Sequence, residues 1–141
     1  MSSSLIDTRD VSSRNVRLRV TEYGSGPPLL LLHGFLMSHA AWDDVVPGFA
    51  ARYRVITPDL PGFGESEKPA PTRFDYGVEA FAECVADLIS ALSLGRPHVI
   101  GHGMSGAIAI APLIPCPITC GRPSDSAEMR SATHSAKAST P

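Results

Sequence analysis

The stretch from residue 98 to residue 106 restricts the possible folds of this chain more than any other segment. Its sequence is His-Val-Ile-Gly-His-Gly-Met-Ser-Gly, a short β-branched run followed by a cluster of small residues. Residues 107–110 then continue with helix-compatible sequence. This pattern is typical of a buried strand that turns sharply into a helix, because glycines stand where side chains would collide. We therefore expect Gly103 at the tip of a strand–turn–helix unit.

The segments before it predict an alternation of strands and helices. An apolar–polar alternation predicts a half-exposed strand, whereas the unbroken Leu29–Leu32 run predicts a strand covered on both faces. Apolar residues at helical spacing predict the helices. We expect strands at 16–23, 29–32 and 53–57, a helix from a Ser38 cap to residue 51, and a helix at 78–92 ended by Gly95. This order predicts an α/β fold with a doubly wound, mainly parallel sheet.

The two ends of the chain differ from this patterned region. Residues 1–15 are polar and without periodicity, so we expect a loose leader. Prolines at 112, 115 and 117 interrupt the helix expected after the turn, since an interior proline breaks a helix. Residues 111–141 are therefore expected to be a disordered tail or an out-of-frame translation. The organised domain is predicted to occupy residues 16–110.

Composition limits the partners and the location of the chain. The net charge of −2 gives no reason to expect nucleic acid or an anionic membrane as a partner. No apolar run is long enough to span a bilayer, and the N-terminus lacks the pattern of a signal peptide, so a cytoplasmic location is expected. Cys84 lies in a helical pattern and is expected in the core. Cys116 and Cys120 lack the spacing of a metal pair, so we expect no metal site and no cofactor.

Three motifs then follow one another along the chain. His33-Gly34-Phe35 comes after a predicted strand, Asp59-Leu-Pro-Gly-Phe-Gly-Glu-Ser66 after the next, and Gly101-His-Gly-Met-Ser-Gly106 after the last. Together they resemble the N-terminal half of an α/β-hydrolase, with its oxyanion loop, its DLPGFGxS loop and its GHSMGG nucleophile elbow. The resemblance implies hydrolysis of esters, C–C bonds, epoxides or haloalkanes, without choosing among them.

The resemblance also assigns roles to positions in this sequence. It implies a nucleophile at position 103 and an oxyanion hole formed by the backbone N–H groups of Phe35 and Met104. His33 is expected to brace a turn through backbone contacts, and Asp59 to bind backbone amides. Trp42 and Phe49 are expected in the core. The remaining motif residues are expected to shape the turns: Gly34, Gly62, Gly64, Gly101, His102 and Gly106.

The departures from the family pattern decide the expected activity. Gly103 offers no nucleophilic atom, and the acid and catalytic histidine of the family are expected beyond residue 141. Ser105, Asp125 and His134 follow one another in the order Ser, Asp, His, which is the order of a catalytic triad. However, Ser105 would lie in the first helical turn, about 200° away from the tip. We therefore expect these three residues to be bystanders.

Two hypotheses follow. The first is a hydrolase by descent that accepts a small apolar ester-like substrate but is inert or nearly so, and in which Gly103→Ser alone does not restore activity. The second is a non-catalytic fragment or pseudoenzyme that binds a small apolar ligand or a protein partner. In that case the strand at Val99–Ile100 becomes an exposed sheet edge, and self-association through it is expected.

Overall fold

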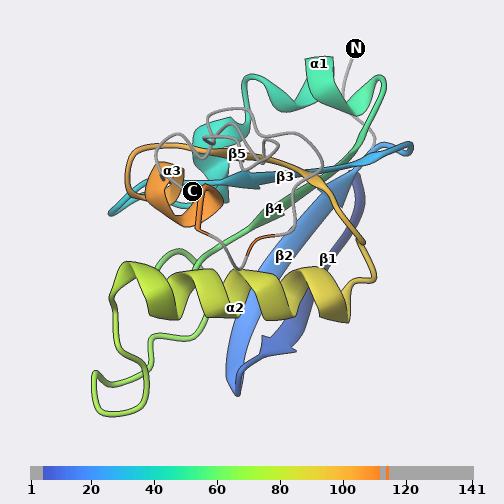
Figure 1. Ribbon diagram of the computed structural model, residues 1–141. Helices are drawn as coiled ribbons and strands as arrows, with labels where there is room; N and C mark the ends of the chain where they lie inside the picture. The colour runs from blue at the N-terminus through green and yellow to red at the C-terminus, as the bar shows by residue number, and fades with distance from the viewer. Residues whose placement is uncertain (1–4, 112–113, 115–141) are drawn as a thin grey trace.

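The computed structural model describes residues 5–111 and 114 (Figure 1). Strands and helices alternate from β3 onward, as the sequence predicts. The strands are β1 (Leu5–Ser13), β2 (Val16–Tyr23), β3 (Pro28–Leu32), β4 (Arg54–Pro58) and β5 (His98–Gly101). The helical segments are the 3-10 helix η1 (His39–Trp42) and the α-helices α1 (Val46–Ala50), α2 (Val78–Ala91) and α3 (Met104–Ala109).

The strands form one sheet in the order β1-β2-β4-β3-β5. β3 pairs in parallel with β4 and β5, whereas β2 pairs antiparallel with β1 and β4. The expected α/β fold is confirmed, and its sheet is mixed. Among the described strands β5 lies at one edge and β1 at the other.

The expectation of a loose leader is wrong for residues 5–13, which form β1. This strand lies at a sheet edge and is held by ion pairs to β2, Asp10 with Arg19 at 2.8 Å and Arg9 with the buried Glu22 at 2.9 Å. A tight turn joins β1 to β2, with positive φ at both Arg14 and Asn15, as two-residue hairpins of type I′ require. Ion pairs between side chains of β1 and β2 hold this strand, and its sequence lacks a regular alternation of apolar and polar residues. Hydrophobic periodicity therefore did not predict it.

The single helix expected at 38–51 is also wrong, because two short segments occupy this range. Ser38 caps η1 as expected, by accepting a hydrogen bond of 3.3 Å from the N–H of Ala40. Pro47 lies in the first turn of α1. A proline there cannot continue a helix from η1, since its ring would clash with the carbonyl four residues earlier.

Helix α2 confirms the helix expected at 78–92, although it ends differently. Ser93, not Gly95, follows the C-cap in the left-handed region, with φ of 57°. The N–H of Ser93 donates to the carbonyl of Ser90 and that of Leu94 to the carbonyl of Ile89, both at 3.0 Å. This double hydrogen bond is the Schellman motif.

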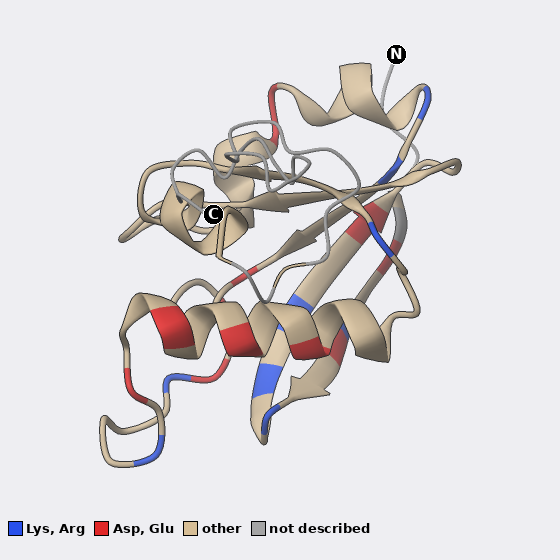
Figure 2. Cartoon of the chain, viewed as in Figure 1, with Lys and Arg blue, Asp and Glu red and all other residues tan. Residues whose placement is uncertain are grey.

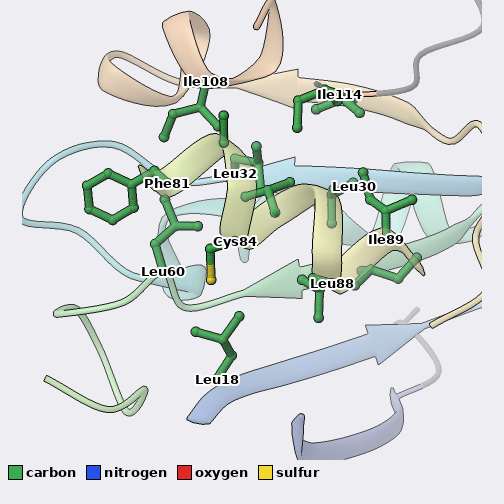
Figure 3. Packing of buried hydrophobic residues seen from close by; sticks show 14 of the residues in the cluster. Leu18, Leu30, Leu32, Leu60, Phe81, Cys84, Leu88, Ile89, Ile108 and Ile114 are labelled. Atoms are coloured by element: carbon green, nitrogen blue, oxygen red, sulfur yellow. The ribbon is translucent and has the colours of Figure 1, made fainter. Parts of the chain in front are cut away.

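Both faces of the sheet are covered, as the Leu29–Leu32 run predicts. Leu30 and Leu32 face the larger cluster under α2 and α3, where Cys84 is fully buried, as expected for a core thiol (Figure 3). Leu29 and Leu31 face a smaller cluster under α1. Trp42 and Phe49 are half-buried against that smaller cluster, in line with the expected core role.

The outer side of α2 is acidic. Glu79, Glu83 and Asp87 are exposed on it at intervals of four residues, opposite the apolar side that packs on the sheet (Figure 2). Within the described ranges no helix is long and apolar enough to cross a bilayer.

Candidate functional site

The candidate site lies where β3 and β5 end side by side. Leu32 pairs with Gly101 in the parallel register, and the N–H of His102 donates a hydrogen bond of 3.0 Å to the carbonyl of Leu32. The chain continues from β3 into His33-Gly34-Phe35 and from β5 into the turn at Gly103. The first and third sequence motifs therefore meet at the carboxyl edge of the sheet, where α/β proteins bind their ligands.

The turn at Gly103 confirms the strand–turn–helix unit predicted from sequence. Gly103 has φ of 60° and ψ of −121° and directly precedes α3. A Cβ placed on Gly103 would meet only the Cα of Gly34, at 3.9 Å, when its two chain neighbours are set aside. The tip of the turn is exposed and sterically open, and it carries no side chain.

Other positions of the motif are closely packed. A Cβ on Gly101 would lie 2.0 Å from the carbonyl oxygen of Ser105, so only glycine lets α3 approach the end of β5. A Cβ on Gly34 would lie 2.7 Å from Nδ1 of His102. The same test at Gly106 finds an ordinary contact of 3.8 Å with the oxygen of Gly101. The tight packing therefore falls on Gly101 and Gly34 and not on Gly106.

Two backbone donors flank the open tip. In the part of the chain that the structure describes, the N–H groups of Phe35 and Met104 donate to no carbonyl or side chain. Phe35 follows Gly34 along the loop after β3, and Met104 is the first residue of α3. The two N–H groups that the resemblance assigns to an oxyanion hole therefore have no acceptor among the described residues.

His33 braces the loop, as the sequence analysis expects. Its side chain is fully buried, Nε2 accepts a hydrogen bond of 2.9 Å from the N–H of Leu60, and Nδ1 lies 2.8 Å from the carbonyl of Gly34. This arrangement assigns the proton to Nδ1, since Nε2 acts as acceptor. Burial lowers the pKa of His33 below the ordinary value of 6.5.

Asp59 holds two loops together through backbone amides, also as expected. Its buried carboxylate accepts hydrogen bonds from the N–H groups of His39, at 2.7 Å, and Glu65, at 2.9 Å. A Cβ on Gly64 would lie 2.3 Å from this carboxylate, which explains the glycine. Gly62 has positive φ, and a Cβ there would lie 2.7 Å from the Tyr76 ring.

Asp59 has one further partner, His39, that no sequence motif indicates. Nδ1 of His39 lies 2.9 Å from the same carboxylate oxygen that binds the His39 N–H. The two residues are 20 positions apart and on different segments, so no local spacing could have linked them. The adjacent ends of β3 and β4 bring them together.

Ser105 does not stand at the tip. Its side chain is fully buried, and Oγ donates a hydrogen bond of 2.5 Å to the carbonyl of His33. Asp125 and His134, which follow Ser105 in triad order, lie outside the described residues, as do Cys116 and Cys120. Across residues 5–111 and 114, no group of three or more His, Cys, Asp or Glu side chains could hold a metal ion.

Comparison with known proteins agrees with this geometry. The family model for the alpha/beta hydrolase fold matches residues 27–112, more than half of the chain. The chain belongs to the α/β-hydrolase family. It is 43% identical over 93 residues to a soluble epoxide hydrolase from Corynebacterium sp. (strain C12), covering 66% of this chain and 32% of that protein.

Two further relatives show the breadth of the family. A fluoroacetate dehalogenase from a Burkholderia species is 38% identical over 104 residues, which cover 72% of this chain and 33% of that protein. The crystal structure of an epoxide hydrolase from Vigna radiata superposes with a TM-score of 0.69 at 27% identity, covering 74% of this chain and 32% of that one. The chain spans between 25% and 38% of the length of the curated relatives it matches.

Proposed function

We propose that this chain carries the N-terminal half of a hydrolase site of the ester, C–C bond, epoxide or haloalkane lineage, impaired because the nucleophile position is vacant. The observation that carries the proposal is Gly103 at the exposed tip of the turn after β5. Nucleophilic catalysis needs an oxygen, a sulfur or a carboxylate at such a tip. Gly103 supplies none of these.

The neighbouring serine gives no substitute in this proposal. The hydroxyl of Ser105 is buried and donates to the carbonyl of His33, so its oxygen faces the interior of the strand–helix junction. The free N–H groups of Phe35 and Met104 support retention of the electrostatic half of the site, because backbone donors do not depend on side-chain identity. The proposed state is a site able to bind a carbonyl oxygen but without a side chain at position 103 to attack its carbon.

Labelling with an alkyl fluorophosphonate, which reacts with activated serine hydroxyls, tests this proposal. We expect the purified chain to remain unlabelled and to form no covalent intermediate on a serine when it is incubated with aryl esters or aryl epoxides. The variant Gly103→Ser places a hydroxyl group at the nucleophile position for comparison. We expect this variant also to show no serine-dependent turnover. Stoichiometric labelling of Ser105, located by peptide mass spectrometry, would overturn the proposal.

A second function is favoured by the apolar rim beside the tip, Phe35-Leu36-Met37. These side chains are 63%, 77% and 40% exposed, and Leu36 has φ of 62°. A bulky residue held at positive φ and pointing into solvent is typical of a functional loop. The rim would bind a small apolar ligand without turnover.

Isothermal calorimetry with a small aryl ester as probe tests the binding function. We expect Leu36→Ser to weaken binding about tenfold. Val45→Ser is the matched control, since Val45 is 44% exposed but lies between η1 and α1. Equal loss of affinity in both variants would contradict a binding site at the rim.

A further inference from the structure

One imidazole stands beside the open tip and has no role in the site described so far. His102 lies between the end of β5 and Gly103, and its side chain is exposed. Its Nδ1 faces Gly34 closely enough that a Cβ there would be 2.7 Å away. His102 therefore lies against the loop that presents the N–H of Phe35.

The backbone of His102 is fixed on both sides. Its N–H donates to the carbonyl of Leu32 at 3.0 Å, and its carbonyl accepts from the N–H of Ser105 at 3.1 Å. Within the described ranges the imidazole itself makes no hydrogen bond. The ring therefore stands on a fixed backbone, and its nitrogen atoms are free to act as a nucleophile or base.

The surroundings favour a substrate with a small apolar acyl group. Phe35 and Met37 are exposed on the same loop as Gly34, and the sulfur of Met37 would lie 3.1 Å from a Cβ on Gly34. A Cβ on Gly34 would thus meet both the His102 ring and the Met37 sulfur, so the ring and the apolar rim lie next to the same residue of the loop.

We propose that the His102 imidazole replaces the absent side chain as a nucleophile, giving slow hydrolysis of activated aryl esters of small apolar acids. This inference rests on the proposed function, because it places the ester at the same edge of the sheet. The rate is expected to be modest. Imidazole attacks only esters with good leaving groups, and among the described residues no side chain hydrogen-bonds the ring to orient or activate it.

The reaction balances with water as the sole co-reactant. A lone pair on one ring nitrogen forms an N–C bond to the ester carbonyl carbon, and the C–O bond breaks as the aryloxide leaves with its electron pair. The acylated ring loses its N–H proton to solvent. Water then forms a C–O bond to the same carbon and the N–C bond breaks. One proton of the water goes to the ring nitrogen, the other goes to solvent, and the carboxylate departs.

Hydrolysis of p-nitrophenyl acetate by the purified chain tests the proposal, with an equal concentration of free imidazole as reference. We expect the chain to exceed free imidazole about tenfold, through proximity, and His102→Gln to lose that excess. His98→Gln is the matched control, because His98 is an exposed histidine at the opposite end of β5. It should retain the rate within about twofold of the unsubstituted chain.

Circular dichroism should show that His102→Gln and the shorter His102→Asn remain folded. An unsubstituted chain no faster than imidazole, an undiminished rate in folded His102→Gln, or equal loss in His98→Gln would each overturn the inference. These outcomes leave the proposed function intact, whereas fluorophosphonate labelling of Ser105 would overturn the proposed function.

Discussion

The hydroxyl of Ser105 lies 2.5 Å from the carbonyl oxygen of His33, and both side chains are fully buried. This hydrogen bond joins the first turn of α3 to the loop after β3, which are 72 residues apart in sequence. The N–H of Met104 precedes Ser105, and the N–H of Phe35 follows His33 by two residues. The bond therefore links the two backbone segments that carry the free N–H groups of Phe35 and Met104.

Ser105→Ala should destabilise the fold by about 1–3 kcal/mol, because the buried carbonyl of His33 loses its side-chain donor. Urea unfolding followed by circular dichroism measures this change. Ser90→Ala is the control, since Ser90 is exposed on α2 and the substitution favours helix. If both variants unfolded at the same urea concentration, the hydrogen bond would not contribute to the stability of the fold.

Gly101→Ala and Gly103→Ala should differ although they introduce the same methyl group two residues apart. The methyl group at 101 would lie 2.0 Å from the oxygen of Ser105, so α3 must move and the chain should lose more than ~3 kcal/mol. At 103 there is space, and only the positive φ opposes the change, at a cost of about 1–3 kcal/mol. Thermal unfolding of both variants gives the order, and a reversed order would contradict the packing described here.

The stability of the chain should fall on acidification below pH 6.5 because of His33. Burial holds the folded-state pKa of His33 below its ordinary value of 6.5. Between these two values the unfolded chain binds a proton that the folded chain does not, so the free energy of unfolding decreases as pH falls. Above pH 6.5 both states are neutral and His33 adds no pH dependence.

Urea titrations at several pH values between 5 and 7.5 measure this dependence. His33→Gln should be less stable at every pH, since Nε2 no longer accepts from Leu60, and its slope against pH should be shallower. Parallel slopes for the variant and the unsubstituted chain would assign the acid sensitivity to other groups.

Ser93→Gly should stabilise the chain by about 0.5–1 kcal/mol. Ser93 holds the left-handed position after α2, with φ of 57°, where glycine has no steric cost. Gly95→Ala tests the same effect in the opposite direction, because Gly95 has φ of 68° and open space around it. Differential scanning calorimetry should show a higher midpoint for the first variant and a lower one for the second.

The sequence by itself determined the elements whose signal is local. The four-leucine run of β3, the helical spacing of α2 and the small residues around Gly103 each specify a backbone conformation without distant partners. The family motifs also follow from sequence, since their glycines mark close approaches such as that of Gly101 to Ser105. The absence of a nucleophilic side chain at position 103 is likewise evident from the sequence.

Tertiary structure alone decided the features that depend on residues far apart in the chain. β1 is held by cross-strand charges, so its polar sequence shows no periodicity. The pairing of His39 with Asp59, the bond from Ser105 to His33 and the position of His102 against Gly34 arise where strand ends meet. Sequence spacing encodes local geometry, whereas strand order determines which side chains converge at the edge of the sheet.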